Sequence, residues 1–199
     1  METGKMDLSE LLGIFDRGET IGTDPEVISA MRFFIAENRR LLFEINNVWH
    51  DDPDEISDLF RQITSKPVGE GFRLTPPFYT DFGKNISIGD HVFINADCKF
   101  QDQGGIYIGD RTFIGHNVVL ATLDHDPDPA KRLLMHPAPI RIGKNVWIGS
   151  NVTVTRGVTI GDNSIIAAGA VVTRAIPANV VAGGVPARVI KTIEESIME

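Results

Sequence analysis

The residue best suited to acid–base chemistry in this chain is His125, in the segment Asp124-His125-Asp126-Pro127. Histidine titrates near neutral pH, so its imidazole can take a proton from a hydroxyl group that attacks an acyl carbon. Two other histidines, His116 and His136, lie on either side of this segment. Aspartate and proline favour a loop, in which a side chain stays accessible. A single loop histidine is also an ordinary surface residue, so its role depends on the elements that hold it.

The last third of the chain is locally basic. The whole sequence is acidic, with a formal net charge of −8, which argues against a nucleic-acid-binding protein. Residues 141–191 reverse this balance, because Asp162 is their only acidic residue. A basic stretch on an acidic protein favours a small anionic ligand. Its six basic residues are Arg141, Lys144, Arg156, Arg174, Arg188 and Lys191.

Length, cysteine content and hydropathy restrict the class of protein. With 199 residues the chain can form one sizeable core, and its single cysteine, Cys98, cannot form an internal disulfide. We expect Cys98 to pack inside that core. No apolar run approaches the length of a membrane span, and the N-terminus has no basic segment followed by an apolar one. We therefore expect a cytoplasmic protein that does not associate with a membrane.

A six-residue repeat of aliphatic side chains must form the elements that position these residues. A helix needs spacings of three and four, and a single strand needs a spacing of two. A sustained six therefore predicts a parallel β-helix of short strands and turns. The same register begins earlier, at Ile88. One series is Ile142, Ile148, Val154, Ile160, Ile166 and Val172, and the other is Val146, Val152, Val158, Ser164, Ala170 and Ile176.

Turn residues and interruptions divide this repeat. Gly-Asp or Gly-Lys-Asn sequences follow the strands at residues 89–90, 109–110, 143–145 and 161–162, where we expect corners with positive φ. Gly104-Gly105 lengthens one step by two residues, which indicates a bulge or a widened corner. Residues 122–138 skip the repeat altogether. We expect them to leave the coil as a functional loop.

The remaining sequence predicts caps at both ends of the coil. Two helices are expected before the repeats, one starting at Thr23-Asp24-Pro25-Glu26 and the other at Asp52-Pro53. We expect residues 1–75 to form a helical cap, because an open end of a β-helix exposes unpaired strand edges. The β-helix itself would span residues 76–191. Residues 192–199 would form a C-terminal tail with a short helix near Thr192–Met198.

The repeat and its local motifs resemble the hexapeptide-repeat acyltransferases, in particular the galactoside and maltose O-acetyltransferase branch. The motifs are Val-Trp-Ile-Gly-Ser at 146–150, Gly-Val-Thr-Ile-Gly-Asp at 157–162, Ala-Ala-Gly-Ala-Val-Val-Thr-Arg at 167–174 and Gly-Val-Pro-Ala-Arg-Val-Ile-Lys at 184–191. This resemblance implies a left-handed β-helix and a homotrimer with active sites between subunits. It also implies acetyl-CoA as the donor and a sugar hydroxyl as the acceptor. No set of metal ligands is legible in the sequence, so we expect no metal.

The resemblance also assigns roles to individual residues. The Thr122–Asp126 segment matches the loop that carries the family's catalytic histidine, which places that role on His125. His116 would be structural. Four residues match positions that line the acceptor site or orient the histidine, namely Asn95, Asp81, Asp102 and Met135. Seven match the acetyl-CoA groove, namely Trp147, Ser150, Ala168, Thr173, Arg174, Arg188 and Lys191.

The implied mechanism has no covalent enzyme intermediate. His125 would deprotonate the sugar hydroxyl, the Ser150 amide would stabilise the oxyanion, and Asp102 or a carbonyl would fix the imidazole tautomer. Gln103 departs from the family pattern, because this position is often acidic in relatives, and it leaves the acceptor undefined. Two alternatives stay open. One is a trimeric zinc carbonic anhydrase, which needs three histidines around a metal, and the other is a non-catalytic sugar-binding scaffold.

Overall fold

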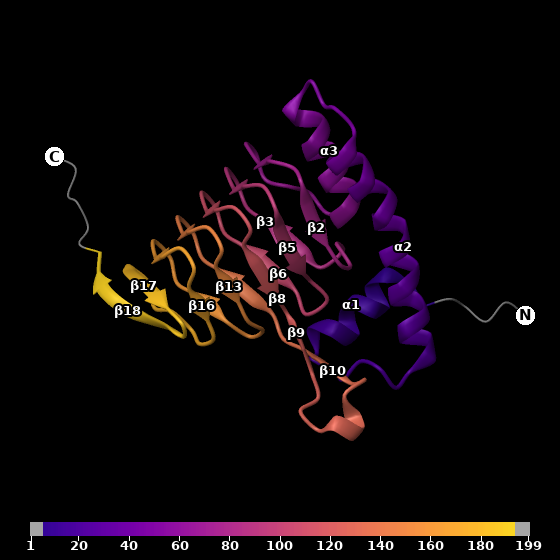
Figure 1. Ribbon diagram of the computed structural model, residues 1–199. Coiled ribbons are helices and arrows are strands. Elements are labelled where there is room, and N and C mark those ends of the chain that lie inside the picture. Colours follow the sequence, from indigo (N-terminus) through magenta and orange to yellow (C-terminus); the bar gives the residue numbers. More distant parts are fainter. Residues whose placement is uncertain (1–5, 194–199) are drawn as a thin grey trace, which may run out of the picture.

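The computed structural model describes residues 6–193, and it shows a tapering stack of β-coils with helices packed against its N-terminal end (Figure 1). The helices are α1 (Leu8–Asp16), α2 (Pro25–Asn47) and α3 (Pro53–Thr64). Asp24 and Asp52 cap α2 and α3, as expected, because each carboxylate accepts a hydrogen bond from a backbone amide of the first turn. No helix among the described residues is long and apolar enough to cross a membrane.

Three parallel sheets form the walls of the coil, which confirms the β-helix predicted from the repeat. Sheet I contains β1 (Arg73–Leu74), β4 (Phe93–Ile94), β7 (Phe113–Ile114), β12 (Trp147–Ile148), β15 (Ile165–Ile166), β17 (Val180–Gly184) and the antiparallel β18 (Ala187–Thr192). Sheet II contains β2 (Phe78–Thr80), β5 (Cys98–Gln101), β8 (Val119–Ala121), β13 (Thr153–Val154) and β16 (Val171–Val172). Sheet III contains β3 (Ile86–Ile88), β6 (Ile106–Ile108), β11 (Ile140–Ile142) and β14 (Thr159–Ile160).

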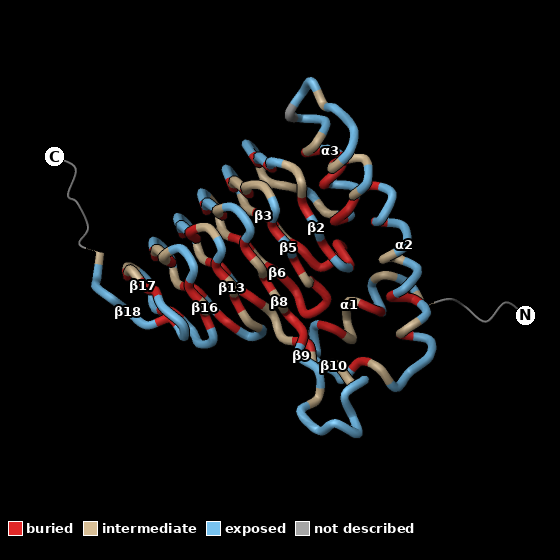
Figure 2. Tube along the Cα trace, in the orientation of Figure 1, coloured by how far each residue is buried: buried red, intermediate tan, exposed pale blue. Residues whose placement is uncertain are grey.

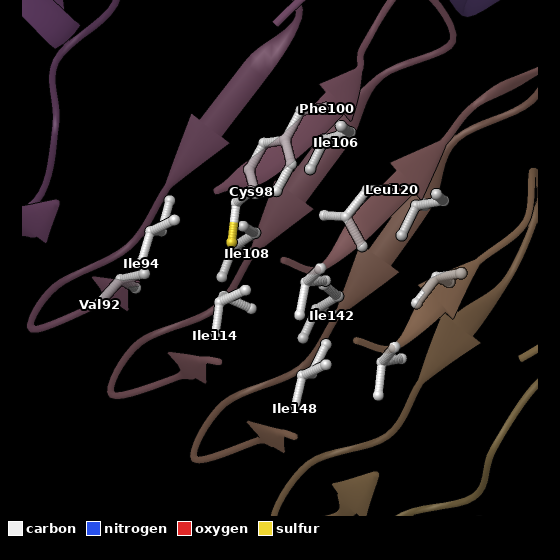
Figure 3. Packing of buried hydrophobic residues seen from close by; sticks show 14 of the residues in the cluster. Val92, Ile94, Cys98, Phe100, Ile106, Ile108, Ile114, Leu120, Ile142 and Ile148 are labelled. Carbon is white, nitrogen blue, oxygen red and sulfur yellow. The ribbon is translucent and has the colours of Figure 1, made fainter. Parts of the chain in front are cut away.

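Both six-residue series point into the coil. Every member is buried, including Ser164, whose hydroxyl donates a hydrogen bond to the Pro177 carbonyl at 2.8 Å. Figure 3 shows how residues of successive coils stack in this core, with Cys98 among them. Burial raises the pKa of the Cys98 thiol to about 11, so the side chain behaves as a small apolar residue. The interior is continuous from the first coil to the last (Figure 2).

The corners between sheets III and I differ in detail from the expectation. Positive φ occurs at the residue after each Gly-Asp pair, as at Arg111 and Asn163, whereas Gly89, Gly109, Gly143 and Gly161 have ordinary backbone angles. These glycines are required because consecutive coils approach closely. A Cβ on Gly109 would lie 2.7 Å from the backbone of Gly143. The glycines therefore set the spacing of the coils, and the following residues turn the chain.

Residues 122–138 leave the coil at the corner between sheets II and III and form a protruding hairpin (Figure 1). Its antiparallel strands are β9 (Leu123–His125) and β10 (Met135–Pro137), and the short 3₁₀ helix η1 (Pro129–Lys131) lies between them. Gly104, in the widened corner below, allows this departure, because a Cβ there would lie 2.7 Å from the Thr122 carbonyl oxygen. Ile140 still pairs with Ile106, so the coil continues in register beyond the hairpin.

Two segments differ from the sequence-based expectations. Helix α1 was not predicted, although Asp7 and Glu10 form a reciprocal capping box at its start. The start of the predicted C-terminal helix, near Thr192, is wrong. Thr192 is the last residue of β18, which pairs antiparallel with β17. The rest of that predicted helix, from 194 onward, lies outside the described residues.

Candidate active site

His125 lies on β9 of the hairpin, where its side chain is exposed to solvent. Its Nδ1 atom lies 2.7 Å from the carbonyl oxygen of Arg132, which comes from the other arm of the hairpin. Because a carbonyl can only accept a hydrogen bond, Nδ1 must carry the proton. The neutral ring then has an unprotonated Nε2 that can act as a base. Met135 is the cross-strand partner of His125, so the structure brings these two predicted residues together.

Asp81 belongs to a pocket of about 240 Å³ on the outer face of sheet II. Partial burial of its carboxyl group raises the pKa of Asp81, although hydrogen bonds from the Gln103 and Gln101 side chains oppose this rise. The Gln101 side-chain oxygen also accepts a hydrogen bond from the Leu123 amide at 3.3 Å. Asp81 is therefore linked through Gln101 to the base of the hairpin that carries His125. The pocket is lined by Tyr79, Asp81, Lys99, Phe100, Gln101, Val119 and Ala121.

Gln103, which departs from the family pattern, lies next to this pocket and is 5% exposed. One of its side-chain atoms, the buried Oε1, has no hydrogen-bond partner among residues 6–193. An unpaired buried carbonyl oxygen is costly, because it loses its hydration without compensation. This position thus combines an amide group that contacts Asp81 with an acceptor atom that is still unsatisfied.

Asp102 has a different environment from the one expected for a residue that orients His125. It is fully buried, and its Oδ1 accepts hydrogen bonds from the Thr80 hydroxyl at 2.7 Å and from the Phe82 and Gly83 amides at 2.9 Å. Oδ2 accepts from the Asn85 amide at 3.1 Å. Burial raises the pKa of Asp102, while these four bonds oppose the rise. The carboxylate thus organises the 80–85 turn, and the Arg132 carbonyl is the group that contacts His125.

A second group of predicted residues lies in a groove of about 380 Å³ along the corner between sheets I and II. Trp147 forms one side and is 55% exposed. Ser150 lies at the turn of its coil, and its backbone N–H makes no hydrogen bond with any of the described residues. The groove contains the expected Trp147, Ser150 and Ala168, and also Asn95, which was expected in the acceptor site. Its other lining residues are Gly115, His116, Gly149, Ile165, Ile166 and Ala167.

His116 was expected to be structural, yet it lines this groove. Its backbone carbonyl accepts the Asn151 amide at 2.8 Å, so the residue also serves the corner as a turn residue. The sequence contains a pattern that could have predicted the position of His116 in the groove. His116 follows the same inward isoleucine and glycine, in Ile-Gly-His, that Ser150 follows in Ile-Gly-Ser, and equivalent corners stack on one another.

The four remaining predicted residues lie outside this groove. Thr173 and Arg174 are exposed at the far end of β16, on the other edge of sheet II. Arg188 and Lys191 are exposed on β18. Lys191 pairs with Val181, and Val181 pairs with the groove residue Ile165. Two strand spacings of about 4.8 Å therefore place Lys191 about 10 Å from the groove along sheet I.

The two groups of predicted residues lie at opposite edges of sheet II. Asn95, His116 and Ser150 precede its strands, whereas His125 and the hairpin follow β8. Leu123 lies seven positions after His116, on the far side of β8, which corresponds to about 23 Å of extended chain at about 3.3 Å per residue. One copy of this chain therefore does not bring the imidazole of His125 to the groove.

The histidines do not form a metal site within residues 6–193. No group of three or more His, Cys, Asp or Glu side chains in this range is arranged to hold a metal ion. The ring of His125 is directed to the Arg132 carbonyl and that of His136 to Asp126. The zinc carbonic anhydrase alternative thus finds no support in the geometry of these residues.

Comparison with known proteins identifies the family. Residues 85–121 and 139–174 match the family described as "Hexapeptide repeat of succinyl-transferase". The chain is 40% identical over 159 residues to a galactoside O-acetyltransferase of Escherichia coli, covering 79% of this chain and 78% of the relative.

Two solved structures share most of the fold. A maltose O-acetyltransferase from Clostridium difficile superimposes with a TM-score of 0.85 at 35% identity, covering 96% of this chain and all of the other. A hexapeptide-repeat acetyltransferase from Vibrio cholerae in complex with acetyl-CoA gives 0.83 at 34% identity, with coverage of 93% and 99%. The coil is the left-handed β-helix expected from the sequence motifs. The chain therefore belongs to the hexapeptide-repeat acetyltransferases of the galactoside and maltose O-acetyltransferase type.

Proposed function

We propose that this protein transfers the acetyl group of acetyl-CoA to a sugar hydroxyl, with His125 as general base and without a covalent enzyme intermediate. The observation that carries this proposal is the contact of His125 Nδ1 with the Arg132 carbonyl oxygen at 2.7 Å. Because this oxygen can only accept a hydrogen bond, the contact implies a proton on Nδ1 and leaves Nε2 as the proton acceptor on an exposed side chain. A base of this type contributes about 100-fold or more to the rate of acyl transfer.

The reaction proceeds in two proton-coupled steps. Nε2 of His125 takes the hydroxyl proton while the sugar oxygen forms a bond to the thioester carbon, and the carbonyl oxygen becomes negatively charged. The N–H of Ser150, which is free to donate, stabilises this oxyanion. The C–S bond then breaks, and the imidazolium returns the proton to the departing thiolate of CoA. The products are the acetylated sugar and free CoA.

Acetyl-CoA would bind along the groove of Asn95, Trp147, Ser150 and Ala168. The groove is narrow and largely apolar, which suits a pantetheine chain, and Trp147 offers an exposed ring beside it. The relative from Vibrio cholerae was solved with acetyl-CoA bound. The phosphates would extend along sheet I toward Lys191, whose position about 10 Å beyond the groove follows from the strand pairing.

The complete site would form between subunits of a homotrimer. Within one copy, His125 and the groove lie at opposite edges of sheet II, so a second copy must supply the missing half. The outer face of sheet I is apolar, with Phe113 54% and Trp147 55% exposed, as expected for a surface that a neighbour covers. A contact between two different surfaces of the same chain generates a closed ring when the rotation closes, and three subunits complete such a ring. In this assembly the hairpin of one subunit faces the groove of the next.

The test is a thiol-release assay with acetyl-CoA and a panel of galactosides, glucosides, maltose and amino sugars. His125→Ala should lower kcat by at least about 100-fold and leave the affinity for acetyl-CoA near that of the wild type. His91→Asn is the matched control, because His91 lies at a distant corner with φ of 55°, which asparagine adopts readily. If His116→Ala abolishes turnover while His125→Ala does not, the base has been misassigned.

A further inference from the structure

The hairpin that carries His125 has two chemically different faces. His125 pairs with Met135 across the strands, and Asp124 pairs with His136. Because successive side chains of a strand point to opposite faces, His125 and Met135 share one face, and Asp124, Asp126 and His136 share the other. The second face takes no part in the proposed reaction, although it contains three ionisable groups.

His136 connects this second face to the N-terminal part of the chain. Its Nε2 lies 2.9 Å from Oδ2 of Asp126, and its Nδ1 lies 3.2 Å from the hydroxyl of Thr20. The next residue, Ile21, forms an antiparallel bridge with Met135, with N···O distances of 2.9 and 2.8 Å. The segment before α2 therefore acts as a third strand beside β10, and the imidazole crosses from Thr20 to the opposite arm of the hairpin.

A second tie attaches the same face to the coil. Nε of Arg156, at a corner of the next coil, donates to Oδ2 of Asp124 at 2.6 Å. At its base the hairpin has apolar packing, because Leu123 and Met135 contact a buried cluster that includes Phe15 and Ile21. Leu133 near its tip is 85% exposed, and the tip lies in solvent (Figure 2). The polar contacts of His136 and Asp124 therefore add to this apolar anchor and hold the face of the hairpin that the cluster does not cover.

We propose that His136 is a positioning residue, which together with Thr20 and Asp126 forms a clamp that holds His125 in its catalytic orientation. This inference rests on the proposed role of His125. Asp126 follows His125 directly in the chain, and its amide donates to the Leu134 carbonyl at 2.9 Å. Releasing Asp126 frees the backbone on one side of His125. A displacement of about 1 Å can cost about 100-fold in rate.

The clamp can close in either charge state of His136. In the neutral imidazole, Nε2–H donates to Asp126 and Nδ1 accepts from the Thr20 hydroxyl. In the imidazolium, both nitrogens donate, because a hydroxyl oxygen can also accept. The geometry of both hydrogen bonds therefore fits either form of the ring. The other charged groups on or near this face are Asp124, Arg156, Asp128 and Lys131.

Asp126 sets the acidic limit of the clamp. The hydrogen bond from His136 lowers the pKa of Asp126 below its ordinary value of 3.8. The ionised carboxylate of Asp126 therefore stabilises the folded hairpin fully at pH values above 3.8. This stabilisation is lost as the pH falls through the lowered pKa of the folded state. The clamp is thus closed throughout the range in which a histidine base works.

The experiment compares kcat, both KM values and the pH profile of four variants. His136→Ala should lower kcat about tenfold with KM for acetyl-CoA within about twofold, and Thr20→Val should lower kcat about threefold. His136→Gln retains an amide donor near the position of Nε2, so it should recover kcat to within about threefold of the wild type with an unchanged pH profile. Lys131→Ala is the control on the same hairpin and should behave as the wild type.

Amide hydrogen exchange separates failure of the clamp from failure of the proposed base. In His136→Ala, exchange should accelerate at the amides of Asp126 and Met135, and kcat should fall no further when His136→Ala is added to His125→Ala. If exchange and kcat both stay at wild-type values, there is no clamp. If exchange accelerates while His125→Ala remains fully active, the clamp stands and the base assignment fails. If His136→Gln loses as much activity as His136→Ala and the pH profile shifts, His136 is itself catalytic and the positioning role is refuted.

Discussion

Replacing Asp102 by asparagine should destabilise the protein without changing the chemistry of His125. Asparagine can keep an oxygen at Oδ1, where the Thr80 hydroxyl and the Phe82 and Gly83 amides donate. Its NH₂ group must then take the place of Oδ2 and face the Asn85 amide, which is also a donor. The variant thus loses one charge-assisted hydrogen bond and leaves a buried N–H without an acceptor.

The size of the effect follows from these contacts. A hydrogen bond to a charged group and an unsatisfied buried donor each contribute about 1–3 kcal/mol, so we expect a loss of about 2–6 kcal/mol in the free energy of unfolding. For a chain of this length, about 2–4 °C of melting temperature corresponds to 1 kcal/mol, which gives a decrease of about 4–24 °C. Urea and thermal unfolding, followed by circular dichroism, measure both quantities.

Asp162→Asn is the matched control for this experiment. Asp162 is exposed, and its side chain accepts the Lys144 amide at 2.8 Å, so its replacement should cost only about 0.5 kcal/mol. Well below the melting temperature, Asp102→Asn should keep the pH profile of kcat. Unchanged stability combined with a lower kcat and a shifted profile would refute this reasoning, because it would mean that Asp102 acts on His125.

Three further predictions concern the donor, the assembly and acid stability. Changing Arg188 and Lys191 together to Glu should raise KM for acetyl-CoA about tenfold in a salt-sensitive manner and leave kcat unchanged. Acetyl-pantetheine lacks the nucleotide phosphates, so an equal defect with this donor would contradict the placement of the coenzyme. Phe113→Asp should convert a trimer into monomers with little activity, as judged by light scattering, because it puts a charge on the apolar face of sheet I; a wild-type monomer at micromolar concentration would contradict the shared site. Hydrogen bonds from Lys144 and His136 hold the pKa values of Asp110 and Asp126 below 3.8, so the free energy of unfolding should decline as the pH falls below about 4. Unfolding curves that coincide at pH 3 and pH 6 would count against a stabilising role of the Asp110–Lys144 and Asp126–His136 pairs.

The regular part of the fold was predictable because its physical signal is repeated. An inward-pointing residue, most often Val or Ile, recurs every six positions, and each coil needs the next one to bury it, so the pattern recurs many times in the sequence. Helix α1 has no such redundancy. Its signal is a single capping box of Asp7 and Glu10 followed by only two buried side chains, Leu11 and Phe15.

The candidate site was less predictable, because its contacts join distant parts of the chain. The order of residues cannot reveal that the Arg132 carbonyl, rather than Asp102, contacts His125, since the geometry of the hairpin decides this. The tie between His136 and Thr20 spans 116 residues and has no local pattern. His116, by contrast, could have been found by comparing its corner with that of Ser150 one coil later.

The hairpin at the widened corner can change in length without changing the pairing of the coils on either side of it. Its base is closed on the coil by backbone bonds from Thr122 to the Gln101 carbonyl and from Ala138 to the Thr122 carbonyl, at 3.0 and 2.9 Å. Since the coils above and below remain paired, a longer or shorter tip between β9 and β10 costs mainly loop entropy, about 0.6 kcal/mol for each doubling in length. The base of the hairpin is more constrained, because Thr20, Ile21 and Arg156 contact it. Under the proposed function, acceptor preference would therefore evolve at the tip, while the base and the stacked core are retained.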